Sequence, residues 1–100
     1  MGTEIVQVDA DRKWRIHLVV ESEEYVQRTA EGRAAIRHRE VTLPLCWNGT
    51  DFIRGWSQAL SFDSEDEAFD RASRDKRAID QWTIRNKRIW EAESELMQRV

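Results

Sequence analysis

The glycines and the single proline of this chain are confined to its first part. All four glycines and Pro44 lie within residues 1–55, and residues 56–100 contain neither type. Glycine and proline mark turns and interrupt helices. The first part is therefore expected to form short strands joined by turns, and the second an uninterrupted helix. The sequence predicts an α+β fold with an antiparallel meander of four to five strands over residues 3–62 and one long C-terminal helix over residues 64–99.

Length and composition define the broad class of protein. One hundred residues predict a single domain, divided into a β-sheet half (residues 1–62) and a helical half (residues 63–100). The net charge of −3 gives no overall attraction to nucleic acid or to an anionic membrane. Cys46 is the only cysteine, so no intramolecular disulfide can form, and a cytoplasmic location is expected. No apolar run is long enough to span a membrane.

The clearest strand signal is the alternation of Trp14, Ile16, Leu18 and Val20 with more polar residues. A second signal is Asn48-Gly49, a preferred pair for a tight hairpin turn in which both central residues take positive φ. Pro44 predicts an edge or bulge position. The apolar face of the sheet is expected to carry these residues: Trp14, Ile16, Leu18, Leu43, Leu45 and either Trp47 or Trp56.

Residues 22–40 are ambiguous. Their composition favours a helix by local propensity. The alternative is a hairpin in which residues 25–29 and 34–43 flank a turn at residues 30–33, where Gly32 supplies a positive φ. We favour the hairpin, because the apolar stripe of the helical alternative is thin and includes that glycine.

The helical half begins at a capping box, in which Ser64 accepts from the amide of Glu67. At 100° per residue, the apolar residues of this half stay in one sector to the end of the chain, which predicts one continuous helix or two nearly collinear pieces. A straight helix of about 36 residues would be about 54 Å long, which is more than a small sheet can cover.

The far end of this helix is therefore a candidate protein interface. Trp82, Ile89 and Leu96 recur every seven residues, as in a coiled coil. Self-association into a dimer is the favoured interpretation, while folding back onto the sheet and a free docking helix stay open. The expected interface residues are Trp82, Ile89, Trp90, Leu96 and Met97.

The sequence contains no recognisable catalytic motif. It has no glycine-rich phosphate loop, no paired-cysteine motif and no metalloprotease motif. With one cysteine and two separated histidines, His17 and His38, it lacks the ligands for a dedicated zinc site. We therefore expect no catalytic residues, no metal and no cofactor, and a protein that is not an enzyme. The alternative is an enzyme whose active site is assembled from residues that are distant in the sequence.

Two charged patches are candidate binding surfaces. The first is a basic arm containing Arg28, Arg33, Arg37 and Arg39, which could contact nucleic-acid phosphates. The second is the acidic helix start with Asp63, Glu65, Asp66 and Asp70, which could bind a basic partner. Solvation of the arm and capping of the helix dipole account for the same charges without any ligand.

Lys13-Trp14-Arg15-Ile16, followed by the strand-to-helix segment of residues 62–68, resembles the small sheet-plus-helix DNA-binding modules of phage-type integrases. The resemblance covers about half the chain and implies DNA binding. Those modules are basic, whereas the helix start here is acidic, so the resemblance does not define a family.

Taken together, the sequence predicts a small non-enzymatic binding protein that acts through protein–protein interaction. A stand-alone inhibitor or adaptor of the kind that phages and mobile elements encode fits the size and the missing active site. The alternative is a nucleic-acid-binding module that uses the basic arm. No membrane partner is expected.

Overall fold

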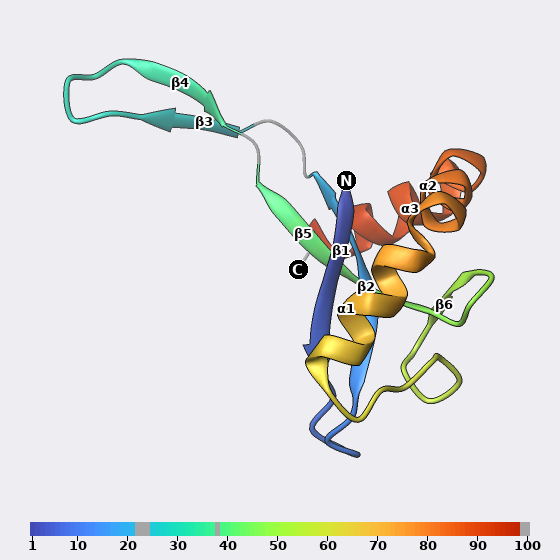
Figure 1. Ribbon diagram of the computed structural model, residues 1–100. Coiled ribbons are helices and arrows are strands. Elements are labelled where there is room, and N and C mark those ends of the chain that lie inside the picture. The colour runs from blue at the N-terminus through green and yellow to red at the C-terminus, as the bar shows by residue number, and fades with distance from the viewer. Residues whose placement is uncertain (22–24, 38, 99–100) are drawn as a thin grey trace.

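The computed structural model describes residues 1–21, 25–37 and 39–98 (Figure 1). A four-stranded antiparallel sheet has the order β1-β2-β5-β6. Its strands are β1 (Gly2–Gln7), β2 (Trp14–Glu21), β5 (Glu40–Trp47) and β6 (Phe52–Arg54). A separate two-stranded hairpin consists of β3 (Tyr25–Arg28) and β4 (Ala34–Arg37). Three helices follow: α1 (Glu65–Arg74), α2 (Lys76–Arg85) and α3 (Lys87–Gln98). The α+β class and an antiparallel sheet of four strands are confirmed, whereas the predicted meander is interrupted, because β3 and β4 form a separate sheet and β2 pairs with β5.

The core lies on one face of the four-stranded sheet, as the alternation in β2 predicts. Ile16, Leu18 and Val20 are fully buried there. Trp47 is also fully buried, whereas Trp56 is exposed, so Trp47 is the tryptophan that completes the apolar face. Helix α1 contributes Ala68 to the same cluster, and its small side chain lets the helix approach the sheet closely.

Strand β5 contains an irregularity at its proline. Between the pairs His17↔Cys46 and Val19↔Thr42, β5 has three intervening residues and β2 has one. Pro44 is the middle of those three residues, which agrees with the predicted bulge position. The carbonyl of Leu43 at this bulge accepts a hydrogen bond from the His17 ring, at 2.9 Å from Nδ1. The bulge thus supplies a partner for a histidine side chain.

The hairpin predicted at Asn48-Gly49 is present between β5 and β6, but its turn differs from the expected one. Trp47 pairs with Phe52, which leaves a four-residue loop. Only Gly49 of the predicted pair has positive φ, at 105°. Asn48 instead acts through its side chain, whose Oδ1 accepts from the amides of Thr50 and Asp51 at 2.9 and 2.8 Å. This Asx-type bonding replaces the second positive φ.

The hairpin interpretation of residues 22–40 is confirmed for the part that the structure describes. Gly32 has φ 79°, and its amide bonds to the carbonyl of Thr29. The single strand expected over residues 34–43 is wrong, because β4 and β5 belong to different sheets. The pairs Glu21↔Glu40 and Tyr25↔Arg37 are separated by three residues on one side and two on the other. The two ladders are therefore not in one continuous register. The hairpin of β3 and β4 projects from the body of the protein in Figure 1.

The single long helix predicted over residues 64–99 is wrong. Helices α1, α2 and α3 are separated by Asp75 and Asn86, residue types that favour helix ends over helix interiors. Each has left the helical conformation, with ψ 6° at Asp75 and ψ 32° at Asn86. Helix α1 contacts β1 and β2, while α3 contacts β5. A straight helix of this length would extend beyond the sheet. The two breaks let the helical half bend, so that its segments pack against different strands.

The first break is held by tertiary contacts. The Asp75 carboxylate accepts from the indole Nε1 of Trp47 at 2.9 Å and from Nε of Arg71 at 2.7 Å. At the second break, the Asn86 side chain reinforces the end of α2: its Nδ2 donates to the carbonyl of Trp82 at 2.9 Å, the same carbonyl that accepts from the Asn86 backbone amide. The polar residue at each break therefore has a defined partner.

Candidate functional site

The basic arm is the most isolated part of the molecule. Strands β3 and β4 pair only with each other among the described strands. Their turn is closed by the amide of Thr29, which donates to the carbonyl of Arg33 at 2.9 Å. Arg28, Arg33 and Arg39 are exposed. The backbone of Arg37 lies in β4, and its side chain is outside the described residues.

The charge of this arm is opposite to that of the remaining chain. Residues 25–39 hold four arginines and one glutamate, a net charge of +3, whereas the whole chain carries −3. The other residues therefore sum to −6. Around the turn, the residues other than Glu31 and Arg33 are small: Thr29, Ala30, Gly32, Ala34 and Ala35. The arm is thus narrow and positive, on an acidic body.

The predicted protein interface is divided by the break at Asn86. Trp82 lies in the core, where its ring packs edge-on against Phe52 at 5.2 Å and its Nε1 donates to Asp51 at 3.0 Å. Trp90 is half-buried and donates to the carbonyl of Thr83 at 2.8 Å. These two tryptophans pack against the same chain, as the fold-back alternative predicts for this part of the stripe.

The remaining three interface residues are exposed on α3. Ile89 is 50% exposed, Leu96 52% and Met97 41%. Ile89 and Leu96 are seven residues apart and share a face, with the exposed Ala92 between them. The neighbouring side of α3, which also carries Met97, packs on the body through Trp90 and the buried Ser94. The apolar sector of α3 is therefore wider than the area that the sheet covers.

The acidic residues at the start of α1 are exposed: Asp63, Glu65, Asp66 and Asp70. Ser64 caps the helix, with its Oγ accepting from the amide of Glu67 at 3.2 Å. Asp63 lies 3.8 Å from Nζ of Lys13. Capping and the helix dipole account for the position of these charges.

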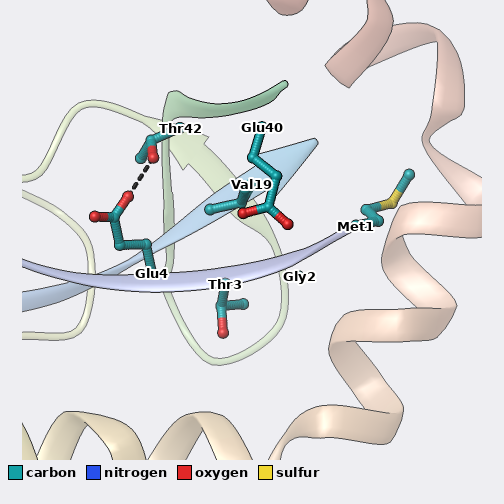
Figure 2. Close-up of a pocket in the computed structure, with 7 residues that line it drawn as sticks. All are labelled: Met1, Gly2, Thr3, Glu4, Val19, Glu40 and Thr42. Carbon is teal, nitrogen blue, oxygen red and sulfur yellow. Dashed lines mark hydrogen bonds between the residues drawn. The ribbon is translucent and has the colours of Figure 1, made fainter. Parts of the chain in front are cut away.

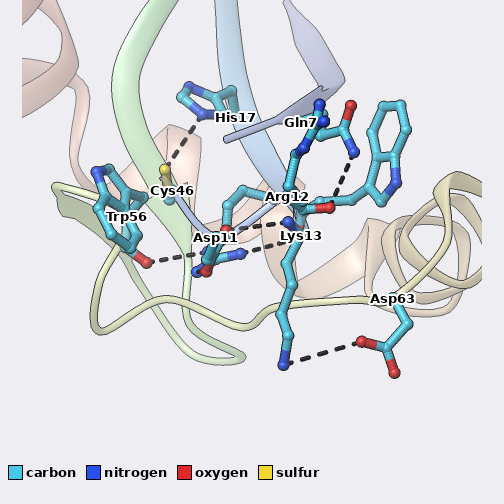
Figure 3. A network of polar contacts seen from close by, with 10 residues as sticks. Gln7, Asp11, Arg12, Lys13, His17, Cys46, Trp56 and Asp63 are labelled. Atoms are coloured by element: carbon cyan, nitrogen blue, oxygen red, sulfur yellow. Dashed lines mark hydrogen bonds and ion pairs between the residues drawn. The ribbon is translucent and has the colours of Figure 1, made fainter. Parts of the chain in front are cut away.

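A polar network that sequence analysis missed lies on the other face of the sheet (Figure 3). Arg15 is one of the polar residues that alternate with the apolar ones in β2, a position typical of a solvated face, yet it is only 3% exposed. Its guanidinium donates to Asp11 at 2.7 Å and to the carbonyl of Trp56 at 3.0 Å, and it lies 5.5 Å from the centre of the Trp56 ring. The Asp11 carboxylate also accepts a hydrogen bond from the backbone amide of Lys13. This bond, and to a lesser extent the bond from Arg15, holds the pKa of Asp11 below its ordinary value. The segment after β6 therefore covers part of this face.

Cys46 and His17 form a thiol–imidazole pair beside this network. Cys46 Sγ lies 3.4 Å from His17 Nε2. His17 Nδ1 donates to the Leu43 carbonyl, so Nε2 of the neutral ring is left to accept from the thiol. Cys46 is 1% exposed, and burial raises the pKa of its thiol, outweighing the opposite effect of Arg15. The pair therefore acts as a structural contact, because an activated nucleophile requires a lowered pKa and access.

The sequence signal for this pair is the pairing of β2 with β5. His17 and Cys46 are direct cross-strand partners on β2 and β5. The irregularity at Pro44 adds two residues to β5, so this pairing could not be obtained by counting residues along the two strands. Within the described part of the chain, no group of three or more histidine, cysteine or acidic residues is arranged to hold a metal ion. None of the described helices has the length and apolar content needed to cross a membrane.

Comparison with known proteins gives no further guide to the site, since no protein-family model, curated protein or solved structure matches this chain.

Proposed function

We propose that this protein is a non-enzymatic binding protein that acts through protein–protein interaction and self-associates through α3. The observation that carries the proposal is the exposed apolar surface of that helix, formed by Ile89 and Leu96 on one face and by Met97 on the neighbouring side. Exposed contiguous apolar surface on a small protein is typical of an interaction site. Such a surface, together with a sequence that has no recognisable catalytic motif, suits a small inhibitor or adaptor.

The size of the surface supports this proposal. The accessible area is 7284 Å², compared with about 6,000 Å² expected for a compact monomer of this mass. The radius of gyration is 15.4 Å, compared with about 13 Å for a compact chain of this length. A protein that exposes more area than its mass requires has surface to bury against a partner.

The flank of the α3 stripe is self-complementary. Arg88 precedes the stripe and Glu95 lies near its end, and both are exposed. In a two-fold dimer with antiparallel α3 helices, Arg88 of one copy lies beside Glu95 of the other, and the pairing occurs twice. A second copy of this chain is therefore the partner that we propose for α3.

Sedimentation velocity at about 100 µM tests the proposal. Wild type is expected to sediment as a dimer, and the double variant Ile89→Asp/Leu96→Asp as a monomer that keeps its circular dichroism. Ile84→Asp is the matched control, because Ile84 is 78% exposed on α2 and lies outside the stripe. A wild type that is monomeric at this concentration contradicts self-association.

A second candidate function is nucleic-acid binding by the arm. It is favoured by the narrow profile of the arm and its net charge of +3. A two-stranded ribbon fits the major groove of duplex DNA, and exposed arginines such as Arg28 and Arg33 contact phosphates. The small residues around the turn offer no large apolar anchor of the type that protein hot spots use.

Mobility shift of a 20-base-pair duplex at low salt tests this second function. Arg28→Ala/Arg33→Ala is expected to weaken binding and to lower the salt dependence by about two phosphate contacts. Arg74→Ala/Arg77→Ala removes the same charge from the exposed body surface and is expected to have a smaller effect. Failure of wild type to shift the duplex at low salt contradicts nucleic-acid binding by the arm.

A further inference from the structure

Strand β1 is an unpaired edge of the main sheet. It pairs with β2 over its whole length, from Gly2↔Val19 to Gln7↔Trp14. Its other side faces no strand among the described residues. Such an edge presents a row of backbone donors and acceptors that another extended chain can use. No proline interrupts residues 2–7, and Glu4 is their only charged residue.

The surface on the two sides of this edge differs in character. On the face opposite the core, a hollow of about 460 Å³ is bordered by Glu4, Glu40 and Thr42. Figure 2 shows Glu4 and Glu40 on one side of β1 and Thr3 pointing to the other side. On the core face, a hollow of about 210 Å³ separates β1 from α1 and α2. Its apolar lining consists of Met1, Ile5, Phe69, Ala72 and Ile79.

One feature of this edge is a cost for the isolated protein. Phe69 is 62% exposed beside the apolar hollow. An apolar group over Phe69 would offset this cost. On the other face, Glu4 is the charged side chain of the edge strand itself, so a cation next to it would be favoured.

We propose that the β1 edge binds an extended segment of a partner protein in which basic and apolar residues alternate. Successive side chains of an added strand point to opposite faces of the sheet. One set would then contact Phe69 and Ile5, and the other would contact Glu4. Backbone bonds to β1 provide affinity and the alternating side chains provide specificity, as in β-strand addition generally. This inference is independent of α3 and of the arm.

The probe is a fluorescein-labelled peptide of the sequence acetyl-Thr-Lys-Val-Lys-Leu-Lys-Val-amide, measured by fluorescence anisotropy against the full chain. A block peptide of the same composition, Lys-Lys-Lys followed by Thr-Val-Leu-Val, keeps the charge and removes the alternation. The alternating peptide is expected to bind at least tenfold more tightly than the block peptide. Equal binding, or no binding of the alternating peptide up to 1 mM, overturns the proposal.

Two variants locate the peptide on the protein. Phe69→Asp and Glu4→Lys are each expected to weaken binding at least fivefold, whereas Glu31→Lys, an equal charge change at the tip of the arm, leaves it unchanged. Backbone amide shifts on titration are expected at residues 3–7, and shifts confined to other elements overturn the proposal. Loss of a wild-type dimer in Phe69→Asp but not in Ile89→Asp/Leu96→Asp also overturns it, because the edge is then occupied by a second copy.

Discussion

The protein contains two β-hairpins with similar glycine-containing turns, one packed against the core and the other projecting from the body. The hairpin of β5 and β6 is anchored by Trp47 and Phe52, whose rings lie 4.9 Å apart in the core. The arm of β3 and β4 pairs with no other described strand and projects from the body (Figure 1). Both turns contain a glycine with positive φ, Gly49 and Gly32. The residues of the turn therefore specify that a hairpin forms, while large apolar side chains such as Trp47 and Phe52 determine whether the hairpin packs against the core.

The largest expected effect comes from removing an anchor of the packed hairpin. Trp47→Ala deletes a fully buried ring and leaves Asp75 without its indole donor. We expect a loss of about 3–5 kcal/mol in the free energy of unfolding, measured by urea denaturation. A loss below about 1 kcal/mol would show that the core does not depend on this hairpin.

The next effect concerns the hydrogen bond that ties this hairpin to the first helix break. Asp75→Asn weakens the charge-assisted bonds from Trp47 and Arg71, and we expect a loss of about 2 kcal/mol at pH 7. The control is Asp80→Asn, since Asp80 is an exposed residue of α2 whose carboxylate pairs with Lys76 at the surface.

The same contact predicts a pH dependence. Burial raises the pKa of Asp75, but the bonds from Trp47 and Arg71 outweigh this and hold it below its ordinary value. The stabilisation is therefore complete above the unfolded-state pKa of about 3.9 and is lost as the pH falls through the lower folded-state pKa. The stability difference between wild type and Asp75→Asn should decrease on acidification below about pH 4. A difference that grows there would contradict this assignment.

A matched pair of glycine variants sharpens the comparison. Gly49→Ala forces a side chain into the left-handed region, 3.4 Å from a guanidinium nitrogen of Arg71, and should cost about 1–2 kcal/mol of global stability. Gly32→Ala imposes the same backbone strain in open space. It should increase amide exchange in the arm and leave the global unfolding transition unchanged. Equal effects on global unfolding would mean that the arm folds with the body.

The smallest effect is expected from deleting the arm. Glu21 and Glu40 are cross-strand partners, so residues 22–39 can be replaced by a two-residue Asn-Gly turn. We expect the free energy of unfolding to change by less than about 1 kcal/mol, because no arm residue whose side chain the structure describes belongs to the core cluster. Thermal and urea denaturation measure it, and a loss above about 2 kcal/mol would assign the arm a structural role.

Local chemistry in the sequence determined the elements. The alternation in β2, the turns at Gly32 and Gly49, the bulge at Pro44 and the Ser64 cap are all present. Each depends on the conformational preference of a few neighbouring residues, which is why the α+β class and the hairpin could be predicted. The basic arm was identified for the same reason.

Tertiary contacts decided the rest. A continuous apolar stripe grouped Trp82 with Ile89, but the break at Asn86 separates them, so one is 6% exposed and the other 50%. Helical periodicity alone cannot reveal a break across which the apolar residues stay in phase. The burial of Arg15 depends on the segment around Trp56, distant in sequence. Whether an apolar or charged side chain is covered depends on which distant elements pack over it, and packing is a property of the whole fold.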